Sequence, residues 1–452
     1  MMQIGPEVDV FTDDNTSFHV AVDAIVAEST IDDHGRWIVS VDVADAFRQV
    51  YAGAYAEISS WVLCYEPPTL TGDPPAHAIS PPEKQTVDKQ VAFAEARHNL
   101  IARLLDGHQL DQAVGLVPET IAGYRQYARL AGADVMRAGR DLGALANQMA
   151  GAGRIAEAVG GQQAAVDVYR AFTPGEVDRL VYEVAFAEAR HNLIARLLDG
   201  HQLDQAVGLV PETIAGYRQY ARLAGADVMR AGRDLGALAN QMAGAGRIAE
   251  AVGGQQAAVD VYRAFTPGEV DRLVYEVAFA EARHNLIARL LDGHQLDQAV
   301  GLVPETIAGY RQYARLAGAD VMRAGRDLGA LANQMAGAGR IAEAVGGQQA
   351  AVDVYRAFTP GEVDRLVYEV AFAEARHNLI ARLLDGHQLD QAVGLVPETI
   401  AGYRQYARLA GADVMRAGRD LGALANQMAG AGRTVEAEAA QQAADEVRHN
   451  HH

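Results

Sequence analysis

Four copies of one segment follow each other along this chain, and this repetition limits the possible folds more than any other feature. The eight residues that begin at Val91 recur unchanged from Val184, Val277 and Val370, a spacing of 93 residues each time. Units repeated at such a period stack, because each unit can bury its apolar face only against its neighbours. The repetition therefore predicts a solenoid, and not the three or so separate domains that 452 residues would otherwise suggest.

Signals for helix ends divide each unit into two helical hairpins. The segment Thr173-Pro174-Gly175-Glu176 has the form of a capping box, so a long helix is expected from there to about Leu198, with a turn at Asp199-Gly200-His201. A second helix is expected over residues 110–130 of the first copy. Pro118 must kink or break that helix, because its ring removes a backbone donor.

The second hairpin of the unit has boundaries of the same kind. Gly132 supplies a C-terminal stop, and Asp134 supplies the N-cap of a third helix that reaches about Ala150. After the turn at Gly151-Ala152-Gly153, a fourth helix is expected over residues 155–172. Each unit is thus predicted to contain four helices.

Both edges of the array are more polar than the inner copies, as a solenoid requires where no neighbour stacks. The last copy departs from the others after Arg433, and four of its polar residues replace Ile155, Val159, Val166 and Tyr169 of the first copy, namely Thr434, Glu438, Asp445 and Arg448. At the other edge Ser80-Pro81-Pro82-Glu83 repeats the capping box, and Lys84, Asp88 and Lys89 replace two valines and a tyrosine. The sequence predicts a solenoid over 81–452 with a polar cap at 434–452.

Short motifs in each unit resemble the tetratricopeptide repeat (TPR) family, in a long-repeat bacterial form. Leu142-Gly143-Ala144-Leu145-Ala146 precedes a turn at Gly153, and Ala158 and Ala165 follow that turn. In the other half of the unit, His108 stands where the family has its turn glycine. The resemblance covers about residues 81–449 and implies an all-α fold, a right-handed α-solenoid of about 16 helices.

The beginning of the chain is a separate, acidic block. Residues 1–90 contain fifteen Asp and Glu but only four Lys and Arg. Alternating segments at 18–26 and 37–43 predict two strands joined around residues 32–35, followed by a helix over 44–63. A small α+β domain is thus expected over 1–65, with a proline-rich linker over 66–80. An adaptor or localisation role is the hypothesis for this block.

Charge and composition exclude several classes of function. A net charge of -19 argues against nucleic acid, which needs clustered Lys and Arg. The sequence shows no apolar run of the ~18 residues that a membrane span needs, and a single cysteine, Cys64, suits a reducing compartment. These two features predict a cytoplasmic protein. Because neither a phosphate-binding loop nor a catalytic triad stands out, we expect that it is not an enzyme and has no cofactor.

Polar residues on the first helix of each hairpin form the candidate binding site. On a helical wheel Glu95, Asn99 and Asp106 fall on one strip, and the TPR resemblance places them, with Arg140 and Asn147 of the next hairpin, in a concave groove. Such residues could hold a peptide backbone or carboxylate. The equivalent positions of the later copies are Glu188, Asn192, Asp199, Arg233, Asn240, Glu281, Asn285, Asp292, Arg326, Asn333, Glu374, Asn378, Asp385, Arg419 and Asn426.

Other interpretations of these residues stay open. The strip could be a solvated face with pairs four residues apart, and Glu95 with His98 could be half of a di-iron motif, although a packed histidine is the simpler interpretation. The leading hypothesis is a scaffold that binds protein or peptide partners, with multivalency from the four copies. The alternatives are a passive spacer or self-assembling rod, and a sensor subunit of an enzyme on another chain.

Overall fold

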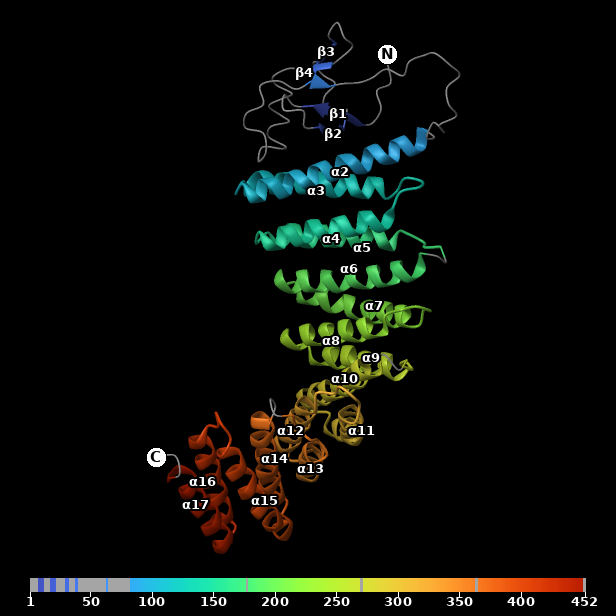
Figure 1. Cartoon of the computed structure of the whole chain (residues 1–452). Coiled ribbons are helices and arrows are strands. Elements are labelled where there is room, and N and C mark those ends of the chain that lie inside the picture. The colour runs from blue at the N-terminus through green and yellow to red at the C-terminus, as the bar shows by residue number, and fades with distance from the viewer. Residues whose placement is uncertain are drawn as a thin grey trace. The chain divides into compact units, whose positions relative to one another are not determined.

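The computed structural model describes most of the two-hairpin repeats and a small set of strands before them. The described residues are 7–11, 17–21, 29–31, 37–39, 62–63, 82–175, 178–268, 271–361 and 365–449. The chain divides into two compact units, residues 1–216 and 217–452, and each is described by itself. Figure 1 shows the order of the elements along the chain.

Five strands of the acidic block form one antiparallel sheet. They are β1 (Glu7–Phe11), β2 (Ser17–Ala21), β3 (Ser29–Ile31), β4 (Trp37–Val39) and β5 (Val62–Leu63), in the order β2-β1-β5-β4-β3. The expected pairing of 18–26 with 37–43 is wrong, because β2 pairs with β1 and β4 pairs with β3 around the predicted turn. The expected helix over 44–63 is wrong at its end, where β5 lies, and its remainder is outside the described residues.

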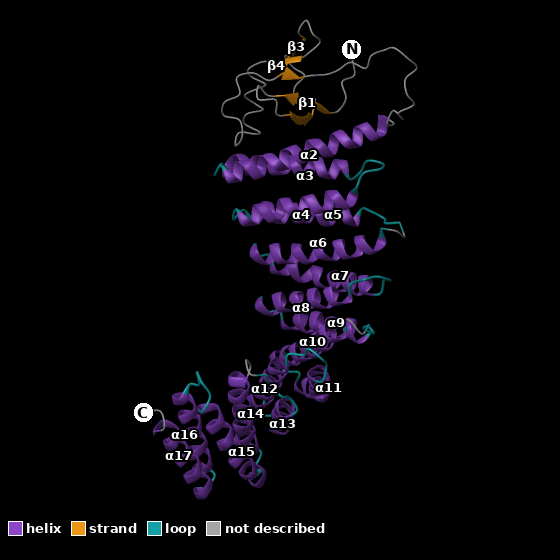
Figure 2. Ribbon diagram, viewed as in Figure 1, coloured by secondary structure: helices purple, strands orange, loops and turns teal. Residues whose placement is uncertain are grey.

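Sixteen helices occupy the described part of the chain beyond residue 81 (Figure 2). Those of the first copy are α2 (Pro82–Asp106), α3 (Leu110–Tyr127), α4 (Val135–Gly151) and α5 (Ile155–Arg170). The second copy contains α6 (Arg179–Asp199), α7 (Leu203–Ala221), α8 (Val228–Gly244) and α9 (Ile248–Arg263). The third contains α10 (Arg272–Asp292), α11 (Leu296–Ala314), α12 (Val321–Gly337) and α13 (Ile341–Arg356). The fourth contains α14 (Arg365–Asp385), α15 (Leu389–Ala407), α16 (Val414–Gly430) and α17 (Thr434–His449).

Consecutive helices pair as hairpins, which confirms the predicted fold class. In the first unit α2 packs against α3 and α4 against α5, and in the second unit α8, α10, α12, α14 and α16 each pack against the next helix. Asp134 caps α4 as predicted, since its side chain accepts a hydrogen bond of 2.9 Å from the Arg137 amide. Gly132 and Gly153 take positive φ angles of 79° and 73° in the two predicted turns.

The predicted start of one helix is wrong, and Pro118 does not cause the break that was one of its two predicted effects. The segment from Thr173 does not begin a helix, because α6 starts at Arg179. Phe172 instead lies 5.8 Å from Tyr182, centroid to centroid, and this contact holds the connection against α6. Pro118 does not break α3, which continues on both sides of it. Val117, just before it, is only 2% exposed, so burial of the apolar face offsets the missing backbone bond.

Small residues let the two helices of a hairpin approach closely. Tyr169 of α5 lies directly on Gly139 of α4, and a Cβ atom at Gly139 would be only 2.2 Å from the tyrosine Cζ. The Tyr169 hydroxyl donates to the Met136 carbonyl at 3.4 Å. The alanine- and glycine-rich composition is therefore what the close helix contact requires.

Aromatic contacts join one copy to the next at three junctions, α5–α6 in the first unit and α9–α10 and α13–α14 in the second. At the first junction Phe186 lies 6.1 Å from Tyr169 and 5.6 Å from Tyr182, centroid to centroid. Gln162, only 1% exposed, donates a 3.0 Å hydrogen bond to the Ala189 carbonyl across the same junction. These contacts supply both the apolar burial and the register of the stack.

The last helix supports the predicted cap. Arg448 of α17 stands at the position of Tyr169 and donates a 2.8 Å hydrogen bond to the Gly418 carbonyl. Asp445, at the position of the buried Val166, is half-buried and accepts from Gln441 at 3.0 Å. Residues that would face a further copy are thus satisfied within the last hairpin, while the boundaries of the cap stay a prediction.

Candidate functional site

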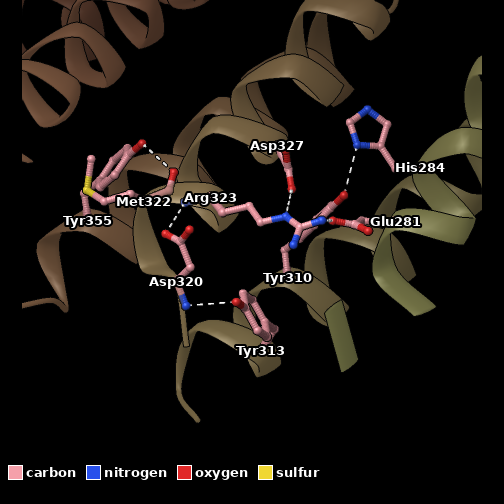
Figure 3. Close-up of polar contacts among 9 residues, drawn as sticks. All are labelled: Glu281, His284, Tyr310, Tyr313, Asp320, Met322, Arg323, Asp327 and Tyr355. Atoms are coloured by element: carbon pink, nitrogen blue, oxygen red, sulfur yellow. Dashed lines mark hydrogen bonds and ion pairs between the residues drawn. The ribbon is translucent and has the colours of Figure 1, made fainter. Parts of the chain in front are cut away.

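A ladder of ion pairs runs between the first helices of successive hairpins. In the third copy Arg323 of α12 pairs with Glu281 of α10, and its Nε lies 3.9 Å from a carboxylate oxygen of Asp327 (Figure 3). The arginine therefore lies between two carboxylates from neighbouring hairpins. We call this group the upper rung, and it recurs as Glu95, Arg137 and Asp141 in the first copy and as Glu374, Arg416 and Asp420 in the fourth.

A buried histidine and tyrosine lie behind the upper rung. The Nδ1 of His284 is 3.1 Å from the Tyr310 hydroxyl, with the two rings edge to face at 6.0 Å. His284 is 9% exposed and Tyr310 is 1% exposed. Figure 3 shows the contact between the two side chains, with Tyr310 next to Arg323. The packed histidine that the sequence favoured over a di-iron ligand is therefore the one observed.

Three hydrogen bonds to backbone groups fix the start of α12 next to the rung. The Asp320 amide donates to the Tyr313 hydroxyl at 2.8 Å, and the Asp320 side chain caps the helix through the Arg323 amide. The Tyr355 hydroxyl of α13 donates to the Met322 carbonyl at 3.3 Å (Figure 3). Three helices thus hold the first turn of α12, which carries the arginine of the rung.

Burial sets the protonation states of this cluster. Burial raises the pKa of the Glu281 carboxyl, and the nearby Arg323 only partly opposes the shift. Burial likewise raises the pKa values of the Asp327 carboxyl and the Tyr310 hydroxyl. The pKa of His284 is lowered by burial, against a smaller opposing effect of Gln334. The imidazole is therefore neutral near pH 7, and the cluster is a structural network in which one arginine lies between two carboxylates.

A second group of polar contacts, the lower rung, joins the same helices near their other ends. Arg289 of α10 donates to Asn240 of α8 at 3.2 Å and to Asp292 of its own helix at 3.0 Å. The same contacts occur in the first unit, with Asn147, Arg196 and Asp199, and again in the second, with Asn333, Arg382 and Asp385. Several predicted groove residues are therefore partners of neighbouring arginines.

The other predicted positions remain at the surface. Asn285 and Arg326 are exposed and form no hydrogen bond or ion pair with any described residue. They lie four residues beyond Glu281 and three beyond Arg323, hence one turn from the upper rung on the same side. We call these positions the open pair. It recurs within one unit as Asn99 with Arg140 and as Asn378 with Arg419, of which Arg419 lies 3.9 Å from Asp413. In the second copy the equivalent residues are both exposed, Asn192 in the first unit and Arg233 in the second.

Three predicted residues do not fall into these groups. Asp106 and Asn426, at the two edges of the array, are exposed and have no partner among the described residues. Glu188 is half-buried. The wheel did not show the partners of the arginines in the two rungs, because it showed which residues share a face and not which side chains meet across helices. Their spacing of 42 and 49 residues from their partners was the only available signal.

A cavity recurs on another part of the second unit. One such cavity, with a volume of about 300 Å³, lies between the end of α11, the start of α12 and the end of α13. The preceding copy, of about 290 Å³, is lined by the equivalent residues. Arg311 and Asp353 line the first cavity and pair with each other at 2.6 Å, and the exposed Arg315 also lines it. No cluster that could hold a metal ion occurs among the described residues.

Comparisons with known proteins find similar repeat structures but no close relative. No family model and no curated protein matches the chain. Similar solved structures include BtubC from P. vanneervenii, with 14% identity over 55% of this chain and 91% of that chain and a TM-score of 0.34. A Podosopora anserina protein described as a kinesin light chain with nearly identical TPR-like repeats has 15% identity over 61% and 99% of the two chains and a TM-score of 0.31.

The quorum sensor NprR from B. thuringiensis, in its apo form, has 10% identity over 79% of this chain and 99% of that chain, with a TM-score of 0.27. The TPR-like repeats among these structures are of the type that the sequence motifs resemble. Likenesses of this size carry no argument about function. Among the described helices, none is long and apolar enough to cross a membrane.

Proposed function

We propose that this chain is a non-enzymatic scaffold that binds protein or peptide partners on the face formed by the first helices of its hairpins. The observation that supports this proposal is the open pair, an exposed asparagine and arginine without partners beside side chains that are held in place by ion pairs. Ordered neighbours reduce the entropy lost when a partner binds. Repetition in four copies allows several weak contacts to act together.

Under this proposal the predicted groove residues have two roles. The glutamates of the upper rung and the asparagines and aspartates of the lower rung order the face, whereas the open pair contacts the partner. An arginine offers a planar fork of donors, and an asparagine offers both a donor and an acceptor. Both suit an extended peptide backbone, whose amide and carbonyl groups need partners of these kinds.

A selection from a random peptide library, with the intact chain as bait, tests this function. The test variant carries Arg140→Ala, Arg233→Ala, Arg326→Ala and Arg419→Ala. The matched control removes four other exposed arginines without partners among the described residues, with Arg129→Ala, Arg222→Ala, Arg315→Ala and Arg408→Ala. Selected peptides should bind the parent and the control at least tenfold more tightly than the test variant, because each lost contact to a charged group costs about 1.5–3 kcal/mol.

The second candidate function is a passive spacer or self-assembling rod. The two rungs favour it, because most polar residues of the face already have partners within the chain. A selection that yields no peptide above background would favour this spacer. Peptides that bind the test variant as tightly as the parent would place the binding site elsewhere.

A further inference from the structure

Each junction between copies buries an arginine that has no partner. Arg283 of α10 is 8% exposed, and its guanidinium carbon lies 3.9 Å from the centroid of the Phe279 ring. It forms no hydrogen bond or ion pair with any described residue, and its Nε is fully buried. Arg190 and Arg376, each 7% exposed, have the same surroundings at the other two junctions. We call these three residues the inner arginines.

The inner arginines form no ion pair, because the glutamate near each of them pairs with another arginine. Glu305 of α11 is the acid with the largest electrostatic effect on Arg283, yet it pairs with Arg263 of the preceding copy at 3.5 Å. The other two junctions repeat this competition, with pairs Arg170–Glu212 at 3.1 Å and Arg356–Glu398 at 3.3 Å. We call Arg170, Arg263 and Arg356 the outer arginines, and Glu212, Glu305 and Glu398 the junction glutamates.

The first copy shows what the inner arginine does when the competitor is absent. There the residue aligned with the outer arginine is His77, and Arg97 pairs with Glu119 at 3.3 Å. The Arg97 side chain is 25% exposed, and its guanidinium carbon lies 3.9 Å from the centroid of the Phe93 ring, as in the other copies. A Cβ atom at Gly123 would be 3.8 Å from the Arg97 guanidinium, whereas one at Gly309 would be only 2.2 Å from that of Arg283. The same sequence thus holds the guanidinium inward only where the glutamate is occupied.

The charges at a junction do not balance. Arg263 lies 3.5 Å from Glu305 and 4.0 Å from Asp260, which pairs with Arg218 at 2.6 Å, and Arg272 lies 3.9 Å from Glu276. One positive charge, that of Arg283, is left over beneath a rim of half-exposed side chains. Burial lowers the pKa of its guanidinium but cannot neutralise so strong a base. The aromatic ring supplies only part of the stabilisation that a desolvated charge needs.

We propose that each junction binds one carboxylate, held between the inner and the outer arginine. A single negative charge neutralises the excess, and the two guanidinium groups offer the parallel donors that carboxylate oxygens accept. The outer arginine is 50% exposed and its glutamate 59% exposed in the third copy, which gives a ligand access from the surface. The chain would thus bind three carboxylates, one at each junction, and none at the first copy, where Glu119 supplies the carboxylate itself.

Saturation-transfer NMR on the intact chain tests the site, with acetate as the probe. The test variant carries Arg170→Gln, Arg263→Gln and Arg356→Gln, which frees the junction glutamates to pair with the inner arginines, as Glu119 does with Arg97. These three positions are exposed, so the variant should fold. The control carries Arg129→Gln, Arg222→Gln and Arg315→Gln, which removes the same charge from exposed positions away from the junctions.

The parent and the control should give a saturable acetate signal, and the test variant should lose at least nine-tenths of it. A capped tripeptide with a central glutamate is the second probe, and the stronger of the two signals shows whether the carboxylate comes from a free acid or a side chain. Absence of a saturable signal from both probes would overturn the proposal, as would an equal signal from the test variant. Displacement of acetate by equimolar chloride at constant ionic strength would overturn the assignment to a carboxylate.

Discussion

Substitution of the glycines beneath the hairpin tyrosines gives the sharpest test of how the repeats pack. At Gly325 a Cβ atom would lie 2.2 Å from the Cζ of Tyr355 and 2.6 Å from its Cε2. The ring cannot retreat easily, because it is 2% exposed and lies 6.1 Å from Phe372 and 6.3 Å from Tyr368, centroid to centroid. Overpacking a core costs about 1–3 kcal/mol of stability. Because the ring is rigid, we expect a cost near the upper end of this range.

The helix propensity of alanine opposes that cost. Replacement of glycine by alanine inside a helix gains up to about 1 kcal/mol, so Gly325→Ala should destabilise the array by about 2 kcal/mol. Sites in separate copies should add, which gives about 6 kcal/mol for Gly139→Ala, Gly232→Ala and Gly325→Ala together. Gly160, Gly253 and Gly346 provide the matched control, because a Cβ atom at each would meet nothing within 4 Å. The same three substitutions there should stabilise the chain.

Urea unfolding followed by circular dichroism measures both triple variants against the parent. The first should shift the unfolding midpoint to lower urea and the second to higher urea, with the slopes read separately because a repeat array need not unfold in one step. Both variants replace glycine by alanine in a helix, so opposite shifts of their unfolding midpoints would follow from the difference in packing alone. A higher midpoint for the first variant would show that the tyrosines do not rest on these glycines, and that the close approach of the helices is misassigned.

Three smaller perturbations test the local contacts. Asp320→Ala removes the cap of α12 and should cost about 1 kcal/mol in urea unfolding, whereas Asp320→Asn, which keeps the acceptor, should cost little. Arg289→Ala removes the lower rung, whose Arg289 and Asp292 side chains are 25% and 48% exposed, and should change stability by less than about 1 kcal/mol. Because the pKa of His284 is lowered in the folded chain, the unfolded chain binds the proton more tightly. Stability should therefore fall as the pH decreases below the pKa of the unfolded chain, which is near 6.5. The variant His284→Phe should lose this part of the pH dependence. The raised pKa values of Glu281 and Asp327 act in the opposite direction at lower pH, so the difference between the variant and the parent measures the histidine.

Helix boundaries were predictable where a single residue determines the backbone. Gly132, Gly153 and the Asp134 cap ended or began helices as expected, because their effects depend on neighbours within a few residues. Pro118 does not break its helix, because the free energy gained by burying the apolar face of α3 outweighs the one missing hydrogen bond. That gain depends on residues far along the chain, which local sequence does not show. The start of α6 was misjudged for the same reason, because the contact of Phe172 with Tyr182 is tertiary.

The candidate site was predictable only as a face. A helical wheel identified the exposed Asn285, because exposure follows from periodicity, and the TPR resemblance identified the exposed Arg326. It could not show that Glu281 and Asn240 already have arginine partners, since those pairs join different helices. A helical wheel could not distinguish the inner arginines, because Arg97 and Arg283 have the same neighbours in sequence. They differ in whether a preceding copy supplies an outer arginine.

Because the copies are identical, the number of ligands bound distinguishes the two proposed sites. The open pair lies on helices within every copy and therefore occurs four times, whereas the junction site needs the outer arginine of a preceding copy and occurs three times. Removal of residues 184–276, one whole copy, should leave three open pairs and two junction sites. A calorimetric titration of the shortened chain should then give stoichiometries lowered by one for both the selected peptide and the carboxylate. A carboxylate stoichiometry equal to the number of copies would place that site within the repeat and not between repeats, because only a junction is lacking at the first copy.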